Sequence, residues 1–396
     1  MWRKFGRLKR TILIVFILFI FCLHLNGFFT TDRFDIVYES GETRLDKVDW
    51  FIVDTNCLER LATNQACHAP IKIASYKTAK FSALFKLTHQ IHMDLEKDYL
   101  TLQPIGNDGD VIRLLARDIA VRTLTPIKLT NGEPQEANVA SNPLFFKRQW
   151  QNGRRLECQP RYVSGTTKKK TRFYEDPKIP TEKIYLFGVV RRQMQVVEAI
   201  PFLISGTLLG WYRECSLIVH TADVDFALQP SDSSNPLVVQ TVRDRHRMIH
   251  ILGDQQNSSS ALEVSFRFDD VPIDMFLMQR LNETHDYFQV FRLSSTSPQR
   301  HKALFPTISE LCAGDMHGFL IYVPCNVEDV LKAEFNEWRH EIHTENYSYL
   351  KAPNLQQDTN FTKEEFAKNI EHFYWQAFFV QNFEVFERLG TVKLSK

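Results

Sequence analysis

The chain has 396 residues, of which 44% are hydrophobic and 24% charged, and its formal net charge at pH 7 is +1. This composition is that of an ordinary globular protein with a sizeable core, and the length is sufficient for two or three domains. The near-zero charge does not indicate a polyanionic partner, so we expect no binding of nucleic acid.

The N-terminus combines a basic segment with an apolar one. Residues 11–29 are mostly apolar, which is long enough for a short membrane span. They follow a tail, 1–10, that contains Arg3, Lys4, Arg7, Lys9 and Arg10. A basic flank stays on the cytosolic side, and no cleavage site is obvious, so a signal anchor is favoured over a cleaved signal peptide. We predict a single-pass type II protein of the Golgi membrane, or of the endoplasmic reticulum, with the rest of the chain in the lumen.

Cysteines and glycosylation sequons agree with a luminal chain. The cysteines outside the apolar segment form an even set, which permits disulfides in an oxidising compartment: Cys57, Cys67, Cys158, Cys215, Cys312 and Cys325. The local pairs Cys57–Cys67 and Cys312–Cys325 are predicted. Because no C-x-x-C pair occurs, a cysteine zinc site is not expected. Sequons for N-glycosylation begin at Asn257, Asn282, Asn346 and Asn360.

The first luminal part is predicted to be a mixed α/β accessory domain over residues 46–165, preceded by a polar stem at 30–45. Strands are expected at 50–53 and 71–74, and the spacing of 111–121 predicts a helix. The polar residues 166–183 indicate a linker. Their lysine run, 168–170, is interpreted as a solvated loop, with contact to an anionic substrate as the alternative.

A catalytic domain is predicted over residues 184–396. Helices are expected at 186–198, 236–253 (basic, ending at Gly253), 327–338 (capped by Asn326) and 361–389, and a strand is expected at 319–323.

Near the start of this domain, a Gly-Thr helix start precedes two alternating aspartates. Residues 200–204 predict a strand, and Ser205-Gly206-Thr207 opens a helical segment, 208–213. Backbone N–H groups at such a start can bind phosphate. In a strand, Asp223 and Asp225 share one face, opposite apolar side chains, where they can bind a divalent metal. An isolated D-x-D is more often a solvated turn, so the combination carries the prediction.

A third carboxylate lies in a predicted β-hairpin. Residues 262–268 and 271–278 alternate apolar and other side chains around an Asp269-Asp270 turn. Asp274 lies on one face of an apolar strand, where an isolated carboxylate needs a partner. A metal shared with the two earlier aspartates would supply that partner, and a salt bridge to an arginine is the alternative.

This order of motifs resembles the active-site layout of the polymerase-β-type nucleotidyltransferase fold. GTLLGWYRECSLIVHTADVDFAL, LEVSFRFDDVPIDMFLM and YVPCNVEDVLKAEFNEW resemble the LicD branch and, within it, the fukutin family, over residues 184–340. The resemblance implies an α/β (α+β) chain with a nucleotidyltransferase-type catalytic domain. Two positions depart from the pattern: Ala222 precedes D-V-D, and Arg339 begins the sequence after Trp338.

The resemblance implies transfer of ribitol 5-phosphate from CDP-ribitol, with release of CMP, to a phosphorylated O-mannosyl glycan of the dystroglycan type. It implies Mg²⁺ or Mn²⁺ as cofactor and complexes with related glycan-processing enzymes. The implied catalytic residues and metal ligands are Asp223, Asp225 and Asp274. Gly206, Thr207 and Arg213 would bind the donor phosphates, and Glu263 is a weaker candidate for the metal shell.

Three other functions remain open from the sequence. A LicD-like transferase of phosphocholine or another phospho-alcohol would use the same core. A D-x-D glycosyltransferase would not need Asp274, and a non-catalytic scaffold would tolerate the loss of all three aspartates.

Overall fold

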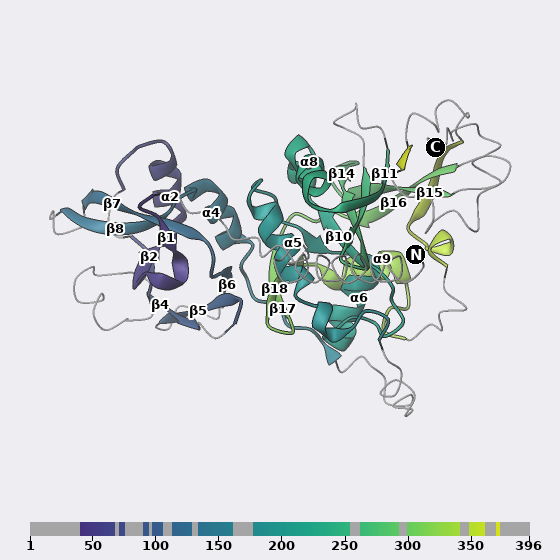
Figure 1. Cartoon of the computed structure of the whole chain (residues 1–396), viewed down its shortest axis with the longest axis horizontal. Helices are drawn as coiled ribbons and strands as arrows, with labels where there is room; N and C mark the ends of the chain where they lie inside the picture. The colour runs from purple at the N-terminus through teal and green to yellow at the C-terminus, as the bar shows by residue number, and fades with distance from the viewer. Residues whose placement is uncertain are drawn as a thin grey trace, which may run out of the picture. The chain divides into compact units, whose positions relative to one another are not determined.

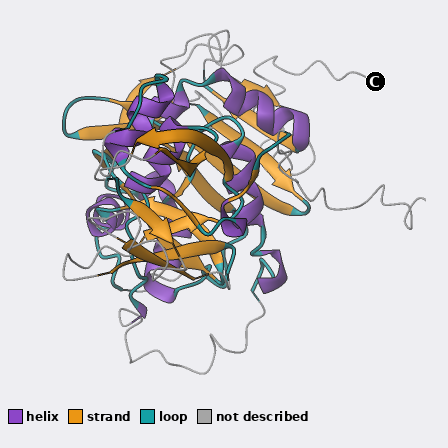
Figure 2. Cartoon of the chain, turned by 90° about the vertical axis from the view of Figure 1, so that its left-hand side faces the viewer, coloured by secondary structure: helices purple, strands orange, loops and turns teal. Residues whose placement is uncertain are grey.

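The structure is a computed structural model (Figure 1). It describes residues 40–67, 71–75, 90–94, 97–105, 113–128, 134–160, 177–253, 262–292, 299–340, 348–360 and 370–372. All of these residues fall within one compact unit, Tyr38–Lys396. Helices and strands are mixed in it, so the α/β class is confirmed (Figure 2).

The predicted membrane anchor and cytosolic tail lie outside the described residues, as does the lysine run at 168–170. No helix in the described part of the chain is long and apolar enough to cross a membrane. Strand β1 (Thr43–Arg44) lies within the predicted stem and pairs with β7 (Ala120–Lys128). The predicted domain boundaries stay a prediction.

The N-terminal part contains three small antiparallel sheets. Their strands are β1, β2 (Trp50–Ile52), β3 (Ile73–Ser75), β4 (Gln90–Asp94), β5 (Tyr99–Ile105), β6 (Arg113–Ala116), β7 (Ala120–Lys128) and β8 (Pro134–Ala140). The helices are η1 (Leu45–Lys47), α2 (Thr55–Ala62) and α4 (Pro143–Gln151). Asp54 and Asn142 cap α2 and α4 by accepting a backbone N–H.

The helix expected at 111–121 is wrong. The described residues of this segment form β6 and the start of β7. Each strand is held by pairing with the strand next to it in the sequence, β6 with β5 and β7 with β8, and the start of β7 also pairs with the distant β1. That pairing outweighs the helical spacing of the apolar residues.

The C-terminal part, which is predicted to be catalytic, is built on an eight-stranded mixed sheet with the order β17-β18-β9-β10-β13-β12-β11-β20. The strands are β9 (Phe202–Leu203), β10 (Val224–Leu228), β11 (Arg247–Leu252), β12 (Glu263–Phe268), β13 (Val271–Leu277), β17 (Leu311–Met316), β18 (Phe319–Pro324) and β20 (Ile370–His372). The helices are η3 (Thr181–Lys183), α5 (Leu186–Gln195), α6 (Ser205–Glu214), α7 (Pro230–Ser233), α8 (Pro236–Arg245), α9 (Val327–Phe335) and η5 (Tyr349–Lys351).

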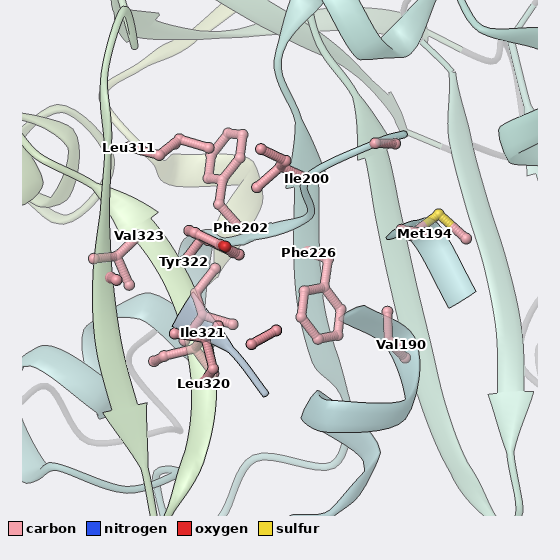
Figure 3. Packing of buried hydrophobic residues seen from close by; sticks show 14 of the residues in the cluster. Val190, Met194, Ile200, Phe202, Phe226, Leu311, Leu320, Ile321, Tyr322 and Val323 are labelled. Carbon is pink, nitrogen blue, oxygen red and sulfur yellow. The ribbon is translucent and has the colours of Figure 1, made fainter. Parts of the chain in front are cut away.

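The side chains of β10 alternate between an apolar face and a polar face of this sheet. Val224, Phe226 and Leu228 are buried on one face, where the Phe226 ring meets the Phe187 ring of α5, with centroids 5.5 Å apart. Figure 3 shows Phe226 close to Val190 within this apolar layer. Asp225 lies on the other face, beside α6. The alternation predicted from the sequence is therefore confirmed.

The C-terminal part has a second sheet, β14-β15-β16-β19, which is antiparallel and follows the hairpin. Its strands are β14 (Gln279–Arg280), β15 (His285–Arg292), β16 (Gln299–Pro306) and β19 (Leu355–Asn360). Stacked rings of Phe276, Phe288 and Phe305 join it to β13, at centroid distances of 4.1 and 5.2 Å.

The hairpin, the helix near 186–198 and the strand near 319–323 are confirmed, whereas three other expectations are wrong. The basic helix ends at Arg245, and 247–252 form β11, because these residues pair with both β12 and β20. Asn326 does not cap α9 through its side chain, which donates to the Thr307 carbonyl. Within the closing segment, 361–389, the described residues are strand β20; the rest lies outside the described residues.

One of three disulfides, together with ion pairs of α5, connects the N-terminal and C-terminal parts. Cys57–Cys67 and Cys312–Cys325 are confirmed, and Cys158–Cys215 joins residue 158 to the C-terminal end of α6. The buried Arg191 of α5 pairs with two N-terminal carboxylates, those of Asp98 and Asp118. These contacts hold α5 and α6 against the rest of the unit.

Two glycines of α6 differ in the space around them. A Cβ at Gly210 would lie 2.8 Å from the Ser216 carbonyl oxygen and 2.9 Å from the Ile218 nitrogen. A Cβ at Gly206 would meet only Asp225 Oδ2, at 3.7 Å. Gly210→Ala is therefore expected to destabilise the protein by about 1–3 kcal/mol. Gly206→Ala should be neutral or stabilising, because alanine favours helix by about 0.5–1 kcal/mol.

Denaturant unfolding of both variants measures this difference. Equal stability of Gly210→Ala and the unchanged protein would contradict the close packing of α6 on the 216–218 loop.

Candidate active site

Asp225 is held at the start of β10 by the first turn of α6. Its backbone N–H donates to Thr207 Oγ1 at 2.8 Å, and that hydroxyl lies 3.5 Å from Asp225 Oδ2. Thr207 is fully buried. The Thr207 hydroxyl is thus engaged with Asp225. The backbone N–H groups at the start of α6, and not this hydroxyl, are then the groups that a ligand could contact. Helix α6 lies against β10, and α9 lies against α6 (Figure 1).

The hairpin brings Asp274 next to Asp225. Strands β10 and β13 are parallel neighbours, and their register pairs Asp225 with Asp274. Paired residues of adjacent strands point to the same face, so the two carboxylates share the polar face of the sheet. Asp223 precedes β10 and accepts a hydrogen bond from Thr221 Oγ1 at 3.3 Å. The three predicted aspartates therefore converge, as expected.

The polar face continues across the next two strands. Ser265 of β12 pairs with Asp274 and bonds its side chain, and His250 of β11 pairs with Ser265. His250 Nε2 lies 2.9 Å from Glu263 Oε1. One ligand atom from each of His250, Glu263 and Asp274 lies within 4.8 Å of the other two. Glu263 was expected only as a weaker candidate for the metal shell, and His250, which was expected on a basic helix, was not predicted to lie at this site.

A fifth carboxyl group, Glu334, comes from α9. It is buried and bonds to the Ser205 side chain, and its charge acts on Asp225. Ser205 has a φ of 49°, a left-handed backbone conformation that costs a non-glycine residue energy. Sequence reasoning missed Glu334 because only the fold brings α9 to the start of α6.

Burial raises the pKa values of three of these carboxyl groups, and neighbouring acids contribute for two of them. Burial raises the pKa of Asp225 well above its usual value, and the charges of Asp223, Asp274 and Glu334 add to the effect. Burial, with the charge of Glu263, raises the pKa of Asp274 to about 7. Burial raises the pKa of Glu334 to about 7 as well. When these carboxyl groups are ionised, the site carries negative charge that cations would stabilise.

His250 is the described basic side chain that offsets part of this charge. Burial alone would lower its pKa, but the hydrogen bond and charge of Glu263 raise it above the usual value. Within the described ranges, no lysine or arginine makes an ion pair with the five acids, Asp223, Asp225, Glu263, Asp274 and Glu334. The alternative of a salt bridge from Asp274 to a described arginine is thus not seen.

The first amides of α6 are available at this face. The first helical hydrogen bond runs from the Leu208 N–H to the Ile204 carbonyl, and no side chain caps the helix. The N–H groups of residues 205–207 precede it, so the helix offers its positive end there. A Cβ at Gly206 would point toward Asp225, so a side chain at this position would occupy the space beside the carboxylates.

Arg213 lies apart from this arrangement. Its buried guanidinium donates to the carbonyls of Trp338 and His340 and to Glu214. These contacts hold the segment after α9 against α6, and a role of Arg213 in phosphate binding stays a prediction.

Among the predicted glycosylation sites, Asn282 is exposed in a turn, where its Oδ1 accepts the N–H of Thr284 and His285. Asn257 and Asn346 lie outside the described residues, and nothing is described of the Asn360 side chain.

The sequence around these carboxylates matches a known protein family. A family model described as LicD/FKTN/FKRP, nucleotidyltransferase domain, matches residues 200–326, which contain the three aspartates. The relatives include ribitol-5-phosphate transferase FKTN of Homo sapiens and of Mus musculus. Residues 200–326 therefore match a LicD/FKTN/FKRP-type nucleotidyltransferase domain, and the chain is similar to proteins of the fukutin family.

The similarity to these relatives is moderate and partial. The human transferase is 25% identical over 232 residues, which are 56% of this chain and 47% of that protein. The mouse transferase is 29% identical over 160 residues, 40% of this chain and 33% of its own length. An uncharacterized protein of Caenorhabditis elegans, W02B3.4, is 24% identical over 83% of this chain and 84% of its own length. This chain therefore spans about half, or less, of the two named transferases.

The charge at the LicD-type site predicts that neutralising Asp274 stabilises the metal-free protein at alkaline pH. Above pH 7 the carboxyl is ionised in both folded and unfolded states, so folding bears the full cost of its burial. As the pH falls from 7 to about 4, only the folded state takes up the proton and the cost declines. Asp274→Asn should raise the melting temperature at pH 8 on the order of 2–4 °C, and by little near pH 4.5.

Thermal melts in a chelator at both pH values measure this effect. Asp269→Asn, at the exposed turn of the same hairpin, is the matched control: Asp269 pairs with Lys183, so this variant should gain nothing. A lower melting temperature of Asp274→Asn at pH 8 would show that the carboxylate has a stabilising partner.

Proposed function

We propose that the chain is a metal-dependent phosphotransferase that moves ribitol 5-phosphate from CDP-ribitol to a phosphorylated glycan on a secretory glycoprotein. The acceptor would be an O-mannosyl glycan of the dystroglycan type. The acceptor oxygen forms a bond to the phosphorus that carries ribitol, the bond from that phosphorus to CMP breaks, and CMP and the hydroxyl proton are released.

One observation carries the proposal: the pairing of Asp225 with Asp274 on parallel strands beside the open start of α6. Carboxylates and free helix N–H groups on one face suit a donor that brings both phosphates and metal. The family supports a transferase. The ribitol donor rests on the similarity to the human ribitol-5-phosphate transferase FKTN, and it is proposed here for this chain.

The side chains fit Mg²⁺ or Mn²⁺. Asp223, Asp225 and Asp274 supply oxygen atoms, the ligands that both ions prefer, and their charge is not offset by a described lysine or arginine. When bound, such an ion lowers the pKa of a coordinated hydroxyl and offsets charge on transferring phosphate.

The protein's own residues position the carboxylates and provide groups that can bind the donor phosphates. Thr207 fixes the Asp225 backbone and carboxylate. The Gly206 backbone can approach a phosphate closely because it lacks a side chain, and the N–H groups of 205–207 can donate to phosphate oxygens. Asp274, held by Ser265, is oriented toward Asp225 across the sheet.

We further propose residence in the Golgi membrane, or in the endoplasmic reticulum, as a type II protein with the catalytic part in the lumen. The three disulfides support an oxidising compartment. The exposed sequon at Asn282 is available for glycosylation there. Partners would be the glycoprotein acceptor and related glycan-processing enzymes.

The first test follows CMP release from CDP-ribitol, with a phosphorylated glycan acceptor and Mg²⁺ or Mn²⁺. Asp225→Asn and Asp274→Asn should each lower the rate by at least about 100-fold, as expected when a group that stabilises the transition state is lost. Asp269→Asn, the charge control on the same hairpin, should keep the rate.

Each other outcome has a defined meaning. Release only from CDP-choline would keep the chemistry and replace ribitol by a phospho-alcohol of the choline type. Full activity in Asp274→Asn would contradict the carboxylate arrangement and favour a D-x-D glycosyltransferase.

A second test uses Gly206→Ala, for which the structure predicts an intact fold. The added methyl group would lie on the side of Asp225, where the donor phosphates are proposed to bind. The Michaelis constant for CDP-ribitol should rise about 10-fold or more, which is the loss of at least ~1.4 kcal/mol of binding, while the melting temperature is kept. An unchanged Michaelis constant would place the donor elsewhere.

A further inference from the structure

The polar face of the sheet extends beyond the three aspartates to an imidazole. His250, Glu263 and Asp274 come from the adjacent strands β11, β12 and β13, and one potential ligand atom from each lies within 4.8 Å of the others. His250 is 4% exposed, so its ring is fixed by the surrounding protein. Three donor atoms at this separation can surround a single ion after small side-chain adjustments.

The chemistry of this set differs from that of the aspartates alone. A nitrogen and two carboxylates suit Mn²⁺ and similar transition metals, whereas Mg²⁺ prefers oxygen ligands only. The Glu263–His250 bond at 2.9 Å orients the ring, as carboxylates do for histidine ligands.

A plain ion pair between His250 and Glu263 does not account for the charge. A protonated His250 offsets one carboxylate, yet Asp274 lies within reach of both partners and faces Asp225 and Asp223 as well. No described lysine or arginine makes an ion pair with these acids. Removing buried charges from water is costly unless they are compensated, and a second cation would provide that compensation.

His246 is a nearby histidine whose hydrogen-bond partner is not a carboxylate. It bonds to the neutral Gln193 at 2.7 Å and packs on the rings of Phe266 and Phe268. It lies close to His250 in sequence and offers a matched control.

We propose that His250, Glu263 and Asp274 form a second divalent-cation site, which shares Asp274 with the site of the proposed transferase. The inference rests on the proposed function only through this shared ligand. Mn²⁺ is the ion that the mixed nitrogen and oxygen donors fit best among the two candidate cofactors.

The experiment uses the full chain, purified without a histidine tag and loaded with Mn²⁺. Pulsed electron paramagnetic resonance detects a ¹⁴N nucleus bound to Mn²⁺, and equilibrium dialysis counts the ions. The unchanged protein should show ¹⁴N coupling and about two ions per chain. His250→Gln should lose the coupling and one ion, and His246→Gln should behave as the unchanged protein.

Two further variants separate this proposal from the proposed function. Asp225→Asn should keep the ¹⁴N coupling although transfer is lost. Glu263→Gln, which keeps a hydrogen-bonding side chain, should weaken binding at the ¹⁴N-coupled ion about 10- to 100-fold. This variant decides the matter if His250→Gln does not fold.

Absence of ¹⁴N coupling in the unchanged protein, or its persistence in a folded His250→Gln, would overturn the proposal. Coupling that is present in a chain without transfer from any CDP-alcohol would contradict the proposed function and leave the metal site established.

Discussion

The arrangement of this protein depends on mutual repulsion among five carboxyl groups, Asp223, Asp225, Glu263, Asp274 and Glu334. Like charges in a poorly hydrated site destabilise the fold, and here a single described histidine offsets them. A fold that contains such a cluster of carboxyl groups must compensate their negative charge, either by binding cations or by protonation. Burial raises the pKa values of Asp225, Asp274 and Glu334, and neighbouring acids add to this effect for Asp225 and Asp274. The proposed metal chemistry uses the same charge.

The scaffold resists this repulsion through contacts made on the other face. Phe226 and its neighbours pack on α5, whose Arg191 is tied to Asp98 and Asp118. The Cys158–Cys215 disulfide and the packing around Gly210 fix α6 at its C-terminal end. The carboxylates therefore stay close together because the strands that carry them are held by apolar contacts and hydrogen bonds, which is the preorganisation that phosphate chemistry requires.

The core of the site could be predicted from the sequence because its signals are local. Alternation within β10 and β13 placed Asp225 and Asp274 on polar faces, and the Gly-Thr turn marked the start of α6. The strands 113–116 and 247–252 could not be predicted, since they depend on pairing with other strands, β5 in the first case and β12 and β20 in the second. Glu334 and the His250–Glu263 contact were missed for a related reason: one reaches the site through helix packing, the other through strand register.

The most direct test of the central claim is a crystal structure of the chain with Mn²⁺ and CMP, read through the anomalous signal of manganese. We expect a manganese peak between the side chains of Asp223, Asp225 and Asp274, with the CMP phosphate toward the Gly206 backbone. Manganese absent from these aspartates, or a nucleotide bound away from the start of α6, would contradict it.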